Sequence, residues 1–269
     1  MPVIPVADPA DPRLCHYTRL TDMQLRMVTE PAQGVFLAEG EKVIRRALAA
    51  GLDMVSALMA PKWWPALAAD VPAAVPVFLG SPELLESITG FRLHRGALAT
   101  FRRPVAPDAA QLLTGARTAI LLEDLVDHTN VGAVFRSAAG LGVDALLVTE
   151  RCADPWYRRS IKTSMGAVFT LPWTTVPDAP SAVALARRAG MTSVALDPAA
   201  GSSLRDWRGP AAVLLLLGTE GVGLSDAARA CVDRSFSIPM HHGVDSLNVA
   251  AAAAIACFVF AGDVEDRPG

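Results

Sequence analysis

The segment that most constrains the fold of this chain is residues 238–250, IPMHHGVDSLNVA, which an alanine-rich run follows. An apolar strand end passes through a proline and a tight polar loop directly into a predicted buried helix. Ser246 and Asn248 fall at the first turn of that helix, where free backbone N–H groups are available to a ligand. The segment therefore predicts a ligand site and not only a piece of core.

A second segment, residues 122–140, has the sequence LEDLVDHTNVGAVFRSAAG. Its pattern predicts a helix in which Arg136 lies off the apolar face, and Gly132 leaves space beside the guanidinium for a phosphate or a ribose. A surface ion pair from Arg136 to Glu123 or Asp127 is the alternative. The apolar face has the spacing i, i+3, i+4, i+7 and consists of Val131, Val134, Phe135 and Ala138.

A third segment, residues 214–224, is a strand-like run that ends in the turn GTEGVGL. Gly218, Gly221 and Gly223 permit positive φ angles and a close approach of backbone to ligand. The spacing is not GxGxxG, and neither a P-loop nor a GxSxG motif is present, so a dinucleotide-dependent enzyme is disfavoured. Glu220 is expected to accept backbone N–H bonds that fix the turn.

The chain contains only two asparagines, Asn130 and Asn248, and both lie in these segments. An asparagine side chain donates and accepts hydrogen bonds at once, so Asn130 could orient Arg136 while holding a loop carbonyl. The alternative is that both side chains hydrogen-bond to nearby backbone in a turn or at a helix cap, as asparagines commonly do.

The overall charge gives no support for nucleic-acid binding, because the net charge is −3 and phosphate contacts need clustered cations. Two local clusters of basic residues are still candidate RNA contacts, with a solvated charged face as the alternative. The first cluster is Arg92, His94, Arg95, Arg102 and Arg103; the second, around Trp156 and Tyr157, is Arg151, Arg158, Arg159 and Lys162.

Four cysteines lie far apart, with no CxxC pair and no histidine at zinc-ligand spacing, so no metal is expected. His241 and His242 are adjacent, and neighbours in sequence seldom converge on one ion. The N-terminus lacks a signal-peptide pattern, and the best apolar run, 249–262, is too short to span a bilayer comfortably. We expect a cytoplasmic protein with reduced cysteines and no membrane partner.

In residues 34–101, short apolar runs alternate with helix-like stretches, a pattern typical of a small α/β domain. Ser81, followed by a proline, is placed to cap one of these helices. The sequence RRPVAPDAAQ predicts a linker with a boundary near Pro107, giving domains of 1–107 and 108–269. Beyond it, four apolar runs of strand length separated by helix-like sequence favour a mostly parallel sheet with flanking helices.

In order and character, the three segments resemble the SpoU (TrmH-type) RNA ribose 2′-O-methyltransferases of the SPOUT superfamily. Segment 122–140 supplies N-x-G-x-x-x-R from Asn130 to Arg136, segment 214–224 supplies G-x-E-G-x-G-L, and segment 238–250 supplies IPM and SLNV. KTSMGA at 162–167 is similar to a small-residue segment between the motifs. His242 stands where members often have glycine, and Ala250 replaces a common serine, which leaves the shape of the target-facing loop open.

The resemblance spans about residues 34–260 and implies an α/β fold with a C-terminal trefoil knot. It also implies a small N-terminal α/β substrate-binding domain, similar to an RNA-binding ribosomal protein. S-adenosylmethionine would sit bent in the knot. The resemblance implies that the residues in contact with S-adenosylmethionine are Gly218, Thr219, Gly223, Ile238, Met240 and Leu247. The residues carried over as catalytic are Arg136, Asn130, Glu220, Ser246 and Asn248.

The implied reaction is methyl transfer to a ribose 2′-OH, with Arg136 as an electrostatic and orienting group positioned by Asn130. The N-terminal domain favours 23S rRNA over tRNA as substrate. The alternative function is that of a non-catalytic RNA-binding protein, in which the knotted domain has lost its activity. The helix 246–261 is apolar on all faces and should be covered on every side, in part by a second subunit of a homodimer.

Overall fold

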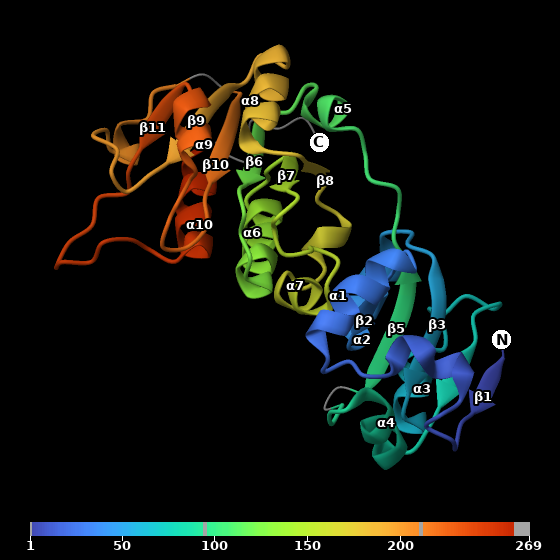
Figure 1. Ribbon diagram of the computed structural model, residues 1–269. Helices are drawn as coiled ribbons and strands as arrows, with labels where there is room; N and C mark the ends of the chain where they lie inside the picture. The colour runs from blue at the N-terminus through green and yellow to red at the C-terminus, as the bar shows by residue number, and fades with distance from the viewer. Residues whose placement is uncertain (1, 94–95, 210–211, 261–269) are drawn as a thin grey trace. The chain divides into compact units, whose positions relative to one another are not determined.

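The computed structural model describes the chain in three stretches, residues 2–93, 96–209 and 212–260. Contacts divide the chain into two compact units, which are Met1–Pro104 with Trp156–Phe169, and Val105–Pro155 with Thr170–Gly269 (Figure 1). The break after Pro104 falls within the stretch that the sequence indicates as a linker. Segment 156–169 is the exception to a single boundary near Pro107, because it packs with the first unit.

Aromatic stacking explains where segment 156–169 belongs. The rings of Trp156 and Phe169 lie against Phe36, with ring centroids 4.8 and 5.5 Å apart. Phe36 also stacks on Phe101 at 5.4 Å. An excursion of this kind leaves no break in composition, so the sequence alone did not indicate it.

The first unit is built on a mixed sheet of five strands in the order β1-β4-β3-β5-β2. β1, β4 and β3 run parallel, whereas β5 pairs antiparallel with both β3 and β2. The strands are β1 (Val3–Pro5), β2 (Val35–Glu39), β3 (Met54–Met59), β4 (Val77–Leu79) and β5 (Ala97–Arg102). The short strand β1 was not predicted, since it holds only three residues and ends in a proline at the sheet edge.

Helices alternate with these strands as the sequence pattern indicated. The side chain of Ser81 accepts a hydrogen bond from the N–H of Leu84 at 3.2 Å, which confirms the predicted cap. The helices of this unit are η1 (Pro12–Tyr17), α1 (Met23–Ala32), α2 (Glu41–Ala49), η2 (Pro61–Trp63), α3 (Trp64–Leu67), α4 (Pro82–Thr89), α7 (Arg158–Thr163) and η3 (Ala167–Phe169).

The second unit has a six-stranded sheet in the order β11-β9-β10-β6-β7-β8, and every strand pair is parallel. The parallel sheet predicted from the apolar runs is therefore confirmed. Its strands are β6 (Thr118–Leu122), β7 (Ala145–Thr149), β8 (Trp173–Val176), β9 (Thr192–Leu196), β10 (Val213–Leu217) and β11 (Arg234–Phe236). The central strands β6, β7 and β10 are buried along their whole length, as expected of strands covered on both faces.

The helices of the second unit are α5 (Ala109–Leu113), α6 (His128–Gly140), α8 (Ala179–Arg188), η4 (Leu204–Asp206), α9 (Asp226–Cys231) and α10 (Val249–Phe260). The apolar face predicted for 122–140 is confirmed, because its four members are buried in α6. α10 packs alongside α6, as Figure 1 shows. Only one side of α10 is covered, since Ile255 and Phe258 are 41% and 75% exposed. In the stretches described, no helix is both long and apolar enough to cross a membrane.

Candidate functional site

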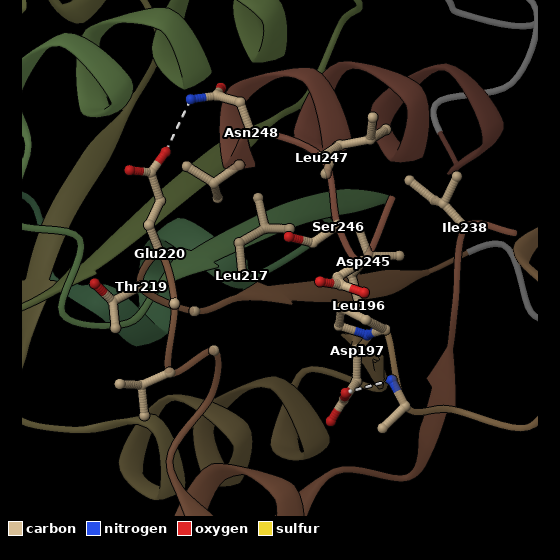
Figure 2. A pocket seen from close by; sticks show the side chains of 18 of the residues that line it. Leu196, Asp197, Leu217, Thr219, Glu220, Ile238, Asp245, Ser246, Leu247 and Asn248 are labelled. Carbon is tan, nitrogen blue, oxygen red and sulfur yellow. Dashed lines mark hydrogen bonds between the residues drawn. The ribbon is translucent and has the colours of Figure 1, made fainter. Parts of the chain in front are cut away.

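A pocket of about 440 Å³ lies at the carboxyl ends of β9 and β10 (Figure 2). Leu196 and Leu217, the last residues of these strands, line it. This is the edge of a parallel sheet at which ligands bind, beside the point where the strand order reverses. The six residues expected to hold a cofactor all line this pocket, and they are Gly218, Thr219, Gly223, Ile238, Met240 and Leu247.

The glycine turn from Gly218 to Leu224 follows β10 and forms one wall of the pocket. A Cβ atom on Gly218 would lie 2.2 Å from the carbonyl carbon of Gly223, so this position has no room for a side chain. The N–H of Gly223 donates to the carbonyl of Thr219 at 2.9 Å and closes the turn. Gly221 and Gly223 have φ angles of 83° and 75°, which favour glycine.

Glu220 joins the three motif segments. Its Oε1 accepts a hydrogen bond from Nδ2 of Asn130 and another from Nδ2 of Asn248, both at 2.8 Å (the second is dashed in Figure 2). Nδ2 of Asn248 also lies 3.1 Å from Oδ1 of Asn130. The expected roles of Glu220 as a backbone acceptor and of Asn130 as a partner of Arg136 are therefore corrected, because these side chains bond to each other.

Both asparagines take part in hydrogen bonds that cap the start of a helix. Asp127 caps α6 by accepting the N–H of Asn130 at 2.9 Å, and this bond holds the pKa of the Asp127 carboxyl below its usual value. Oδ1 of Asn248 accepts the N–H of Ala250 at 2.9 Å at the start of α10. Asn248 thus caps the helix, which was the alternative considered from the sequence, and its amide nitrogen also donates to Glu220.

Arg136 is exposed on α6 and has no bonded partner within the described part of the chain. The alternative ion pairs are not formed, since Glu123 bonds to the N–H and Oγ of Ser225 at 2.8 and 2.7 Å, and Asp127 caps α6. Gly132 is buried, so the open space expected beside the guanidinium is not provided by this glycine. Arg136 is not among the residues that line the pocket.

Three charged residues in the pocket wall were not predicted: Asp197, Arg229 and Asp245. Asp197 accepts the N–H of Ala199 and Nε of Arg229, both at 2.9 Å. Burial alone would raise the pKa of Asp197, but these two bonds outweigh it and the pKa is lowered. The sequence did carry a signal for Asp197, because it directly follows a predicted parallel strand, at the edge where sites form.

In the second basic cluster, three of the four cations are paired with carboxylates. Arg158 donates to Oε2 of Glu39 at 2.6 Å, and Nζ of Lys162 donates to Oε1 of Glu39 at 2.8 Å. Glu39 contacts both cations inside the first unit, and its single negative charge offsets one of the two positive charges. Arg151 bonds instead to Asp124 in the second unit. Arg159 is exposed.

In the first basic cluster, Arg102 faces Asp53 at 3.1 Å, with both side chains largely exposed. Nε of Arg103 donates to the carbonyl of Val35 at 2.8 Å. Arg92 is exposed. The remaining two members of the cluster, His94 and Arg95, lie outside the described residues.

The loop 241–248, which carries the adjacent histidines, is exposed throughout. His242 has a φ of 58°, in the left-handed region that glycine favours, and Gly243 follows with a φ of 75°. The N–H of Val244 donates to the carbonyl of His241 at 3.2 Å. The loop therefore adopts at His242 the conformation expected of the glycine common at this position. Ser246, at its end, lines the pocket.

A model of the SpoU rRNA Methylase family matches residues 117–258, more than half of the chain. The chain belongs to the SpoU rRNA Methylase family. The matched region includes all three motif segments and the pocket between them. The resemblance inferred from the motifs is thus confirmed, and with it the class of RNA methyltransferase.

Two relatives are similar in sequence, one over nearly the whole chain and one over half of it. An uncharacterized tRNA/rRNA methyltransferase of Mycobacterium bovis is 37% identical over 259 residues, covering 94% of this chain and 90% of the relative. A 23S rRNA (uridine(2479)-2'-O)-methyltransferase of Streptomyces viridochromogenes is 37% identical over 139 residues, covering 50% of this chain and 48% of the relative.

A solved structure agrees with the fold over nearly the whole chain. The SpoU methyltransferase AviRb from Streptomyces viridochromogenes, in complex with the cofactor AdoMet, superposes with a TM-score of 0.78 at 26% identity. The match covers 93% of this chain and 97% of AviRb. The α/β fold of this chain is therefore that of SpoU methyltransferases.

Proposed function

We propose that this protein transfers a methyl group from S-adenosylmethionine to a ribose 2′-OH in structured RNA, with 23S rRNA as its substrate. The observation that carries the proposal is the bonding of Asn130 and Asn248 to one carboxylate oxygen of Glu220 at the rim of the pocket. Three segments that are far apart in the chain converge there, next to a glycine turn that admits a ligand against bare backbone.

The pocket suits S-adenosylmethionine by its volume and by the chemistry of its wall. Its volume lies in the usual range for small ligands, and backbone of the glycine turn together with Ile238, Met240 and Leu247 forms much of its wall. Such a wall suits an adenosine group, held through backbone N–H and carbonyl groups. When bound, S-adenosylmethionine supplies an electrophilic methyl group on a sulfonium sulfur.

Arg136 acts on the RNA in this proposal, not on the cofactor. It follows Asn130 by six residues, roughly 9 Å along the helix axis, and its guanidinium is exposed and unpaired within the described residues. A guanidinium is a poor base, so Arg136 orients the acceptor phosphate or ribose and stabilises negative charge. The 2′-OH proton passes to a phosphate or to water.

Positioning carries much of the rate in this mechanism, since methyl transfer is in-line and needs the hydroxyl aligned behind the methyl group. The network of Glu220 with Asn130 and Asn248 connects the start of α10, which lines the pocket, to the start of α6. Ser246 and Asn248 contribute polar groups on the same rim.

Glu220→Ala should lower kcat/KM by about 10- to 100-fold, because both amides lose their charged acceptor at exposed bonds that water replaces only in part. Glu220→Gln is the matched control, since its Oε1 can still accept from both asparagines and most activity should remain. Steady-state rates on rRNA from a strain lacking the gene measure the effect. Wild-type activity in Glu220→Ala would show that the network is dispensable.

The further architecture in this proposal is a trefoil knot at the C-terminus and an RNA-binding domain in residues 1–107, before the catalytic domain at 108–269. The return of the chain to the sheet centre supports the knot, because the hydroxyl of Thr118 at the start of β6 donates to the carbonyl of Phe260 at 3.3 Å. The protein acts in the cytoplasm, where its RNA substrates are.

Identification of the RNA requires a comparison of 2′-O-methylation maps from wild-type and deletion strains. Loss of one site in 23S rRNA is expected, and loss of a tRNA site would support the second candidate substrate. The rival function, a non-catalytic RNA-binding protein, predicts unchanged maps and no binding of radiolabelled S-adenosylmethionine.

The proposed enzyme is a homodimer through the exposed side of α10. Ile255 and Phe258 lie on that side, and a buried aromatic side chain contributes strongly to an interface. Light scattering should give about twice the 28.3 kDa of one chain, and Phe258→Glu should shift the mass to that of a monomer. Val105→Glu, at a residue 96% exposed elsewhere, is the control and should stay dimeric. A wild-type monomer at micromolar concentration would contradict the dimer.

A further inference from the structure

Arg229 of α9 lies in the pocket wall and bonds to neighbours from separate segments. Its Nε donates to Oδ2 of Asp197, directly after β9, at 2.9 Å. Its Nη2 donates to the carbonyl of Val222, in the glycine turn, at 3.4 Å. Its Nη1 lies 3.6 Å from Oδ1 of Asp226. One guanidinium thus connects the end of β9, the glycine turn and α9.

The glycine turn needs a connection at this point. Its first residue is fixed by close contact with backbone, and Ser225, directly after the turn, is bonded to Glu123. Between these ends, Gly221 and Gly223 have positive φ angles, and Val222 is 77% exposed. Glycines lose more backbone entropy than other residues when a turn becomes ordered. A cofactor that binds the turn's backbone must meet that cost unless the turn is ordered beforehand.

We propose that Arg229 is a positioning residue for the cofactor: by bonding Asp197 and Val222 together, it orders the glycine turn before S-adenosylmethionine arrives. This inference rests on the proposed function of the pocket. A planar guanidinium suits the task, because its separate N–H groups reach a carboxylate and a carbonyl at the same time.

Asp197 is a suitable anchor for Arg229. Its side chain is 14% exposed, against 42% for Arg229, and the N–H of Ala199 fixes its second oxygen. The Asp197 carboxyl is ionised at neutral pH, so its bond to Arg229 is charge-assisted, and this bond helps to lower the pKa of Asp197.

The test compares affinities for S-adenosylmethionine by calorimetry in the full-length protein. Arg229→Gln should weaken binding about tenfold, because one charge-assisted contact to the anchor is lost. Arg229→Lys should recover only part of the affinity, since a point charge cannot bond both partners. The maximal rate at saturating cofactor should change little, so the effect belongs to KM for the cofactor and not to kcat.

Arg187 provides a matched control in the same unit. It is similarly exposed, donates to Asp233 at 2.8 Å and to the carbonyl of Cys231 at 2.6 Å, yet it does not line the pocket. Arg187→Gln loses an equivalent surface ion pair and should bind the cofactor as the wild type does. Equal weakening by Arg187→Gln and Arg229→Gln would mean a general loss of stability and would overturn the proposal.

A double-mutant cycle with Asp197→Asn tests the connection itself. Each single change should weaken binding, and the double variant should be no weaker than Arg229→Gln, because both changes remove the same bond. Additive losses would overturn the proposal. Hydrogen exchange of the free protein gives an independent readout, since amides in 218–224 should exchange faster in Arg229→Gln while those of β6 do not change.

The proposed function and this inference fail in different ways. If the wild type does not bind S-adenosylmethionine, the function assigned to the pocket is wrong and Arg229 has no cofactor to position. If the wild type binds and Arg229→Gln binds equally well, the function stands and the role of Arg229 is refuted.

Discussion

Replacing Arg136 with alanine is expected to lower the single-turnover rate of methyl transfer by at least about 100-fold, the size of effect found for donors that stabilise developing charge. Affinity for S-adenosylmethionine and the melting temperature should be unchanged, because Arg136 is exposed, unpaired in the described residues and outside the pocket wall. Arg136→Lys should also be strongly impaired, since an ammonium group lacks the planar fork.

The experiment for Arg136 needs the cognate RNA, single-turnover rates and a cofactor titration of each variant. Arg188, an exposed arginine near the end of α8 in the same unit, is the matched control, and Arg188→Ala should retain full activity. Near-normal turnover in Arg136→Ala would remove it from the reaction. A large fall in melting temperature would make its role structural.

Local patterns were sufficient to predict the parts of the fold that depend on local physics. The apolar face of α6 follows from helical periodicity, and the cap at Ser81 follows from a serine before a proline. Short strands at sheet edges were harder to predict from the sequence. β8 holds four residues, too few for a pattern of alternation or an apolar run to stand out, and the strand expected to end at Ile238 is β11, which holds three residues and ends at Phe236.

The site was predictable in position but not in its bonds. The motifs predicted that Asn130, Glu220 and Asn248 lie near one another, but no local pattern indicates which of these side chains bond to each other. Asn130 and Glu220 are 90 residues apart, so their contact depends on how the sheet orders its strands. Partners for basic residues are missed for the same reason, because Arg158 finds Glu39 at a separation of 119 residues.

Charge patterns along the chain therefore overstate the number of free cations. A run of basic residues predicts an RNA surface only if no distant carboxylate folds against it. Glu39 meets Arg158 and Lys162 through the packing of α7 against β2, which no local property of either segment indicates. Among the basic residues assigned to RNA, the exposed Arg92 and Arg159 are the better candidates for substitution.

The second large effect is expected at Gly218, where even alanine should abolish detectable binding of S-adenosylmethionine. The added Cβ would lie 2.2 Å from the carbonyl carbon of Gly223 and 2.3 Å from the backbone nitrogen of Leu224. Backbone atoms cannot rotate away as a side-chain end can, so the whole turn must shift and its backbone groups leave their positions. Valine at this position should have the same effect with a larger loss of stability.

Gly201 is the control for Gly218, because it lies in the same unit and a Cβ there meets nothing within 4 Å. Gly201→Val should bind S-adenosylmethionine as the wild type does. Calorimetry measures the affinities, and circular dichroism establishes that each variant is folded. A folded Gly218→Ala with wild-type affinity would mean that the cofactor does not contact this turn, and the pocket at the ends of β9 and β10 would lose its assigned ligand.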